Sequence, residues 1–108
     1  MELKYKLWFE EKGEAVLTEL KYRILKEIKE KGSIKEASQS IGISYKKALE
    51  HIKVMERRLG FKIVRRERGK GARLTKEGEC LIKKYEEVKE AFEKLASSFD
   101  EEQGICSG

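Results

Sequence analysis

Five basic side chains lie within nine positions of the sequence, interspersed with two glycines, Gly69 and Gly71. Only one acid, Glu67, interrupts this basic set, which comprises Arg65, Arg66, Arg68, Lys70 and Arg73. Guanidinium and ammonium groups bind phosphate oxygens, and glycines leave backbone N–H groups open to the same ligand. Lysine and arginine also protect the edges of exposed strands, but five bases against one acid exceed that need. We therefore expect this segment to lie along phosphates or to reach a minor groove.

A second polar set begins a predicted helix over about residues 44–59. Four apolar residues recur there at helical spacing and should face inward, namely Ala48, Ile52, Met55 and Leu59. The outward residues of the first two turns are Ser44, Tyr45, Lys46, Lys47, Glu50 and His51. Helices contact the DNA major groove mainly through these turns. Lysine donates to guanine or phosphate, glutamate accepts from cytosine, and serine and tyrosine contact phosphate.

His51 is the only histidine, and the two cysteines, Cys80 and Cys106, fall in other predicted elements. Zinc sites need several clustered His or Cys ligands, so we expect no metal and no cofactor, with His51 instead near DNA. Cys80 is expected to be a packed thiol. No combination of residues typical of a catalytic site is evident, and we expect no enzyme.

The preceding residues complete a helix-turn-helix pattern. Ser33 and Glu36 form a capping box that begins a short helix, and Gly42 supplies the positive φ needed by the turn after it. Ser33 is a cap first and is also a candidate phosphate contact. Beyond residue 60, strands at 61–66 and 73–74 should form a basic β-hairpin, the wing, at about 62–74.

Two further elements flank this core pattern. Leu3, Tyr5, Leu7 and Phe9 alternate with polar residues, which predicts a strand over 3–9 that pairs with a short strand at 15–17. Trp8 breaks the alternation, and either an edge position or a dimer contact would explain it. A helix from Thr18 to Lys31 should follow the hairpin.

The last predicted helix, some 25 residues from Thr75, carries an apolar stripe in a three-four alternation. The stripe comprises Leu81, Tyr85, Val88, Phe92, Leu95 and Phe99. It could pack within the chain, but the helix extends beyond a winged-helix body, so we expect a homodimer interface.

The predicted fold class is mainly α with small β, a winged helix-turn-helix with an N-terminal β-hairpin and a long C-terminal dimerisation helix. The expected organisation is a DNA-binding domain at 1–76, the dimerisation helix at 77–102 and a flexible tail at 103–108.

Charge is unevenly distributed along the 108 residues. Residues 33–76 hold 13 bases and 4 acids, a net of +9, whereas the remainder holds 12 bases and 16 acids, a net of −4. A basic middle favours a polyanionic partner. No apolar run approaches ~18 residues and the start lacks a secretory signal, so we expect a cytoplasmic protein with no membrane partner.

Four stretches, 32–34, 42–48, 55–64 and 69–78, resemble the DNA-binding domain of ModE-type molybdate-responsive regulators. Their broader pattern, including Leu59-Gly60 and Leu74 to Gly78, is shared with LysR-type regulators. The resemblance implies that the helix from Ser44 enters the major groove, that the wing contacts flanking DNA and that the protein is a dimer. The wing is shorter than in many members, and only nine residues follow Phe99. The C-terminal oxyanion-binding modules are thus absent from this sequence, and we expect neither molybdate sensing nor another small-molecule effector.

Two hypotheses of function remain open. The first is a homodimeric transcription regulator that binds a near-palindromic site in double-stranded DNA. The second is a winged-helix protein-interaction module that docks an acidic protein through its basic face and its coiled-coil helix. Bases on both the predicted recognition helix and the wing favour the first.

Overall fold

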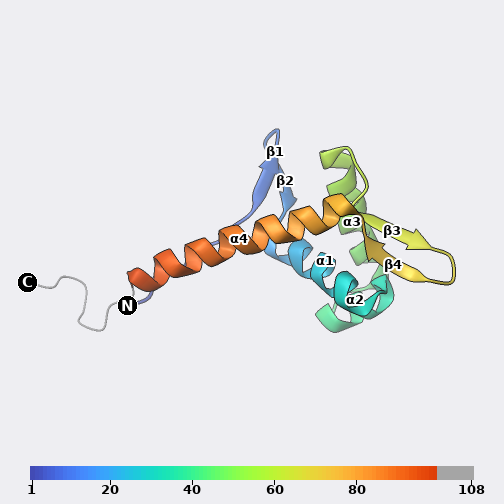
Figure 1. Cartoon of the computed structure of the whole chain (residues 1–108), viewed down its shortest axis with the longest axis horizontal. Coiled ribbons are helices and arrows are strands. Elements are labelled where there is room, and N and C mark those ends of the chain that lie inside the picture. The colour runs from blue at the N-terminus through green and yellow to red at the C-terminus, as the bar shows by residue number, and fades with distance from the viewer. Residues whose placement is uncertain (100–108) are drawn as a thin grey trace, which may run out of the picture.

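The computed structural model describes residues 1–99. The predicted tail at 103–108, the last positions of the predicted dimerisation helix and Cys106 lie outside the described residues. Within residues 1–99 the elements are β1 (Phe9–Glu11), β2 (Glu14–Leu17), α1 (Glu19–Lys31), α2 (Ile34–Ile41), α3 (Tyr45–Leu59), β3 (Val64–Glu67), β4 (Gly71–Leu74) and α4 (Lys76–Ser98). Figure 1 shows α1, α2 and α3 gathered at one end of the molecule, with α4 running from this body to the other end.

All four helices begin at a hydroxyl cap, as the sequence predicts. In each case the side-chain oxygen accepts a hydrogen bond from the backbone N–H three residues later, at 3.1–3.2 Å. The capping residues are Thr18, Ser33, Ser44 and Thr75. Such a cap satisfies one of the backbone donors that a helix start leaves unpaired. The helix Tyr45–Leu59 therefore starts directly after Ser44, where the sequence predicts it.

The core is centred on α1. Its Ile24, Leu25 and Ile28 are completely buried, and the helix contacts each of the other helices as well as β2 and β4. Ala37 of α2 and Ala48 of α3 are also completely buried, because small side chains let these helices pack closely. The buried face of α3 continues through Ile52 and Met55, so the opposite face of α3 points away from the core.

The N-terminal hairpin is shorter than predicted. Only Phe9–Glu11 pairs with β2, antiparallel and with a register shift after Phe9, so the expectation of a strand over 3–9 is wrong. β2 has four residues and offers no partner further back. Residues 1–8 run instead beside α4, toward its C-terminal end (Figure 1).

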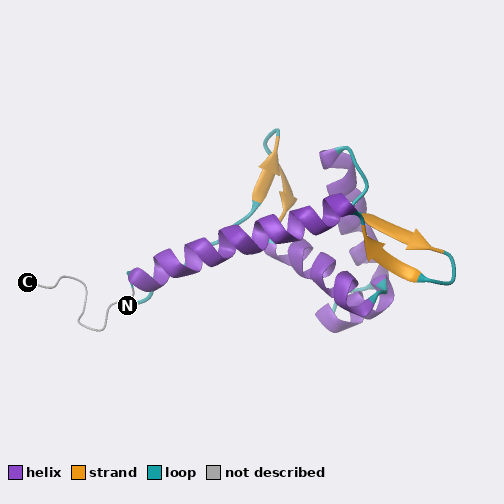
Figure 2. Ribbon diagram, in the orientation of Figure 1, coloured by secondary structure: helices purple, strands orange, loops and turns teal. Residues whose placement is uncertain are grey.

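The wing is an antiparallel hairpin that pairs Val64 with Leu74 and Arg66 with Ala72. Its strands differ from the predicted 61–66 and 73–74, since β3 begins at Val64 and β4 already at Gly71. Just before β3, the backbone N–H of Ile63 donates to the Glu56 carboxylate, while the Ile63 carbonyl accepts a hydrogen bond from Thr75 N–H. Figure 2 shows the two hairpins on separate parts of the molecule.

The first half of α4 is seated against α1 by Ile82 and Tyr85, which are 1% and 2% exposed. A hydrogen bond and an ion pair to Glu86 also join the two helices. The Tyr22 hydroxyl donates to Glu86 Oε2 at 2.5 Å, and Lys26 Nζ lies 2.9 Å from the same oxygen. The Tyr22 hydrogen bond and Lys26 lower the pKa of Glu86, which stays ionised.

Among the described residues, no helix is long and apolar enough to cross a bilayer.

Candidate nucleic-acid interface

The start of α3 presents the predicted polar face to solvent. Ser44, Tyr45, Lys46, Lys47 and Glu50 are all exposed, whereas Ala48 and Ile52 turn into the core. The pattern of burial matches the predicted inward and outward faces over this part of the helix. Three groups that can bind bases or phosphates, two ammonium groups and a carboxylate, therefore protrude from two turns of one helix.

His51 differs from its neighbours because it is only partly exposed. Burial, followed by the positive charges of Lys21 and Lys47, lowers its pKa below the ordinary value. Lys21 itself is a buried lysine of α1, 8% exposed, whose pKa is lowered by burial and by Arg58. The imidazole of His51 is therefore neutral at pH 7 and can form hydrogen bonds but no ion pair.

The five bases of the wing are all exposed but do not share one face. Directly paired residues of an antiparallel hairpin project to the same side. Arg66 is paired with buried Ala72, and thus projects toward α2 and α3, whereas Arg65 and Arg73 are paired on the opposite side. Arg73 also forms an ion pair with Glu67, Nη2 to Oε1 at 2.7 Å. Arg68 and Lys70 lie at the tip.

The structure brings several sequence-predicted residues together around one cleft of about 530 Å³. The cleft lies between the start of α2, the start of α3 and the wing, and its lining includes Ser33, Lys35, Tyr45, Arg66 and Arg68. Arg66 Nη1 donates to the Tyr45 hydroxyl at 3.3 Å, so the wing contacts the recognition helix directly. Bases converge on this cleft with one lining acid, Glu67, which makes it attractive to phosphate.

Two contacts that sequence reasoning missed hold the wing in place. Glu56 of α3, whose side chain is 12% exposed, accepts hydrogen bonds from the N–H groups of Ile63 at 2.8 Å and Val64 at 3.2 Å. On the other strand, Ala72 N–H donates to the Gly32 carbonyl at 2.9 Å. The only hint in the sequence is that Glu56 is one of four acids among the 17 charged residues at 33–76. The wing is thereby fixed to both α3 and the α1–α2 turn.

The apolar stripe of α4 is only partly available to a partner. Tyr85 is 2% exposed and stacks on Tyr22 with ring centroids 4.6 Å apart. Its assignment to a dimer interface is therefore wrong, because it belongs to the core of its own chain. Leu81 and Val88 are half-buried. The remaining members, Phe92, Leu95 and Phe99, are 42%, 52% and 60% exposed.

Cys80 is exposed at the start of α4 and is not the packed thiol that was expected. Its neighbours at Gly78 and Ile82 face the body instead. Trp8 is half exposed, and its indole N–H donates to Glu10 at 2.8 Å.

The chain matches the model of the bacterial regulatory helix-turn-helix protein, lysR family, over residues 21–79, which is more than half of its length. It is also similar to the crystal structure of the CbnR DNA-binding domain in complex with DNA, with a TM-score of 0.62 and 16% sequence identity. The alignment covers 73% of this chain and 90% of the CbnR chain. At this identity the likeness establishes the fold, and it confirms the predicted winged helix-turn-helix class. No curated protein matches the chain significantly by sequence. The chain therefore belongs to the lysR family of bacterial regulatory helix-turn-helix proteins, a family of DNA-binding transcription regulators.

Proposed function

We propose that the protein recognises a specific sequence of double-stranded DNA, with α3 in the major groove and the wing on the flanking backbone. The observation that carries this proposal is the cleft in which Ser33, Tyr45 and Arg66 meet, because it joins α2, α3 and the wing in one basic surface. A duplex lying across the cleft would contact all three elements at once. An α-helix fits the major groove, and an adjoining hairpin then meets phosphates or the minor groove.

The proposed roles follow from exposure and chemistry. Lys46, Lys47 and Glu50 are exposed on the first two turns of α3 and would lie near base edges. Ser33 and Ser44 accept cap hydrogen bonds through their oxygens, which leaves each hydroxyl proton free to donate to phosphate. Tyr45 and neutral His51 would act likewise as uncharged donors.

Within the wing, Arg66, Arg68 and Lys70 would neutralise the phosphates nearest to α3. Arg65 and Arg73 project to the other side of the hairpin, and would add longer-range attraction or contact more distant backbone. The charge of Arg73 is already partly compensated by Glu67, so we expect it to contribute least.

The proposal includes a homodimer that binds a near-palindromic site. Three large apolar side chains on the projecting half of α4 remain 42–60% exposed, and apolar stripes of this kind on soluble proteins mark interaction surfaces. Two copies joined through α4 would place two recognition helices on two half-sites. Replacing Val88 and Leu95 together by glutamate should give a monomer with much weaker specific binding, because the half-sites then act separately.

The resemblance to ModE-type regulators stays a prediction, and the proposal names no small-molecule effector. Because the ligand would be genomic DNA, the proposal places the protein in the cytoplasm.

Selection from a pool of random duplexes tests the proposal. We expect enrichment of one sequence with inverted half-sites, retention of that preference in Lys12→Gln, and its loss or alteration in Lys47→Ala. Lys12 is an exposed base on the N-terminal hairpin, away from the cleft, and serves as the charge-matched control. Failure to enrich any sequence would contradict sequence-specific binding and would favour the alternative, a winged-helix module whose basic face binds an acidic protein.

A further inference from the structure

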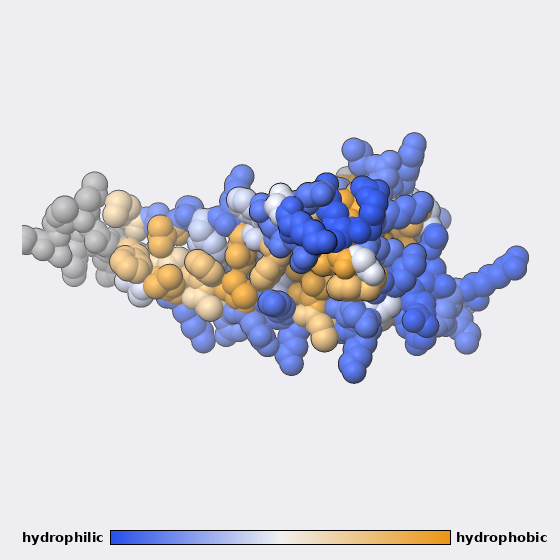
Figure 3. All heavy atoms as spheres, turned by 90° about the horizontal axis from the view of Figure 1, so that it is seen from above, coloured by the Kyte–Doolittle hydropathy of each residue, from blue (hydrophilic) through white to orange (hydrophobic). Residues whose placement is uncertain are grey.

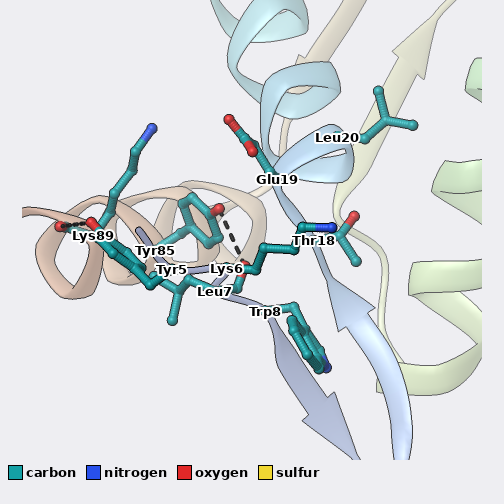
Figure 4. Close-up of a pocket in the computed structure, with 9 residues that line it drawn as sticks. All are labelled: Tyr5, Lys6, Leu7, Trp8, Thr18, Glu19, Leu20, Tyr85 and Lys89. Atoms are coloured by element: carbon teal, nitrogen blue, oxygen red, sulfur yellow. Dashed lines mark hydrogen bonds between the residues drawn. The ribbon is translucent and has the colours of Figure 1, made fainter. Parts of the chain in front are cut away.

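Residues 1–8 precede the segment that matches the lysR-family model, which begins at residue 21. They are held along α4 by two hydrogen bonds. The Tyr5 hydroxyl donates to the Lys89 carbonyl at 3.3 Å, and the Tyr85 hydroxyl donates to the Leu7 carbonyl at 3.4 Å. Figure 4 shows Tyr5, Leu7, Tyr85 and Lys89 meeting at this junction, with the Trp8 ring directed elsewhere. The N-terminal segment is therefore attached to the helix that carries the proposed dimer interface.

This attachment enlarges the apolar surface of α4. The Tyr5 ring packs against Phe92, with centroids 5.5 Å apart, yet Tyr5 remains 38% exposed. Leu3, 48% exposed, lines a shallow hollow together with Ala96 of α4. Figure 3 shows apolar residues collected along one face toward the end of α4. We call this face the composite surface and define it by Leu3, Tyr5, Phe92, Leu95 and Phe99.

We propose that the composite surface, N-terminal segment included, binds a second copy of this chain. The inference rests on the homodimer of the proposed function and extends it to residues 1–8, which α4 alone would not require. Leu3 and Tyr5, which are exposed in the single chain, would then be covered in the dimer.

The area of the surface favours a contribution from the N-terminal segment to the interface. Aromatic side chains bury ~150–250 Å² each when fully covered, so Tyr5, Phe92 and Phe99 at about half exposure would bury roughly 200–350 Å² per copy, to which Leu3 and Leu95 add. A standard interface buries about 800 Å² per partner. The three side chains of α4 alone would fall well short of that area, and Leu3 and Tyr5 bring the surface closer to it.

The charge around the surface also favours self-association. Residues 1–8 and 86–99 together hold four bases and five acids, a net of −1, in a chain whose net charge is +5. A nearly neutral surface of mixed charges can face its own copy without strong repulsion, whereas it offers little attraction to a strongly acidic or basic partner.

Sedimentation equilibrium of the full chain and three variants tests the inference. We expect the wild type to dimerise, Leu95→Glu to be monomeric, and Leu3→Gln to raise the dimer dissociation constant at least fivefold. Trp8→Gln is the matched control, since Trp8 is 50% exposed on the same segment but lies outside the composite surface. It should change the constant less than twofold.

Hydrogen exchange on the unmodified protein provides a second measurement that does not depend on a variant's folding. Protection of the amides at 3–8 should rise when the protein concentration crosses the dimer dissociation constant, while the hairpin turn at 11–14 should not change. Two results would refute the composite surface but not the α4 homodimer. One is a monomeric Leu95→Glu together with an unchanged dimer dissociation constant in Leu3→Gln. The other is concentration-dependent protection of the amides at 90–98 without any at 3–8. A wild type that is monomeric at tens of micromolar would refute the homodimer itself.

Discussion

Two glycines of the wing offer a matched test of how the hairpin is positioned. Gly69 and Gly71 have nearly the same left-handed backbone, with φ of +75° and +79°. A Cβ on Gly69 would meet no atom within 4 Å, whereas a Cβ on Gly71 would overlap the Gly32 carbonyl oxygen. The same oxygen accepts the Ala72 hydrogen bond that joins β4 to the α1–α2 turn. Replacement by alanine thus strains the backbone at both positions, but it displaces a neighbouring segment only at Gly71.

The two substitutions should lower the free energy of unfolding by different amounts. The left-handed conformation costs alanine about 1–2 kcal/mol, which is the whole expected cost of Gly69→Ala. Gly71→Ala adds the displacement and the loss of one backbone hydrogen bond, about 1 kcal/mol or more, for a total of about 2–4 kcal/mol. Urea unfolding followed by circular dichroism should separate the two variants by about 1–2 kcal/mol, at one fixed protein concentration because dimerisation would stabilise the folded state. Equal destabilisation by the two substitutions would refute the close approach of β4 to Gly32.

Three further outcomes are expected. The hydrogen bond from Tyr22 and the ion pair with Lys26 lower the pKa of Glu86 in the folded state, so the stabilisation by Glu86 should be complete above about pH 5 and be lost as the pH falls below about 4. The difference in free energy of unfolding between wild type and Glu86→Gln, measured by urea unfolding, should therefore shrink toward low pH. A difference that grows toward low pH would contradict a lowered pKa. Arg68→Ala should weaken binding to all DNA sequences to a similar extent and reduce the slope of log affinity against log salt by about one, as measured by fluorescence anisotropy. Lys47→Ala should cost about 1–3 kcal/mol on the selected site only, and an equal loss on random DNA would remove Lys47 from the base-contacting set.

The parts of the fold that depend on neighbouring residues could be predicted from the sequence. Helix starts at Ser33, Ser44 and Thr75 were foreseeable because a serine or threonine stands immediately before each helical apolar pattern. The inward face of α3 followed from the spacing of Ala48 and Ile52. Helix-turn-helix order and a basic wing followed in turn from these local signals.

Contacts between distant segments could not be predicted in this way. Glu56 binds the start of β3 seven and eight residues later, and Gly71 approaches Gly32 across 39 positions. Neither pairing leaves a periodic signal. Tyr85 was misassigned for a related reason, since periodicity identifies an apolar stripe but does not distinguish a core from an interface. Its ring packs on Tyr22 of α1, 63 residues away.

The division of the wing bases between two faces was also hidden in the sequence. A register shift of one residue would exchange Arg66 with Arg65 at the cleft, and only the observed pairing of Arg66 with Ala72 settles which one meets Tyr45. The basic composition of the wing was thus predictable, but the identity of the arginine beside the recognition helix was not.

Sequence-specific binding through α3 is tested most directly by the affinity ratio for two duplexes of identical length and composition, one carrying the selected site and one with its bases scrambled. At about 0.15 M salt we predict that the wild type binds the selected duplex at least about 10³-fold more tightly, and that the ratio collapses when Lys46, Lys47 and Glu50 are all replaced by alanine in a protein of unchanged secondary structure. Equal affinity of the wild type for both duplexes would contradict recognition of bases by this helix.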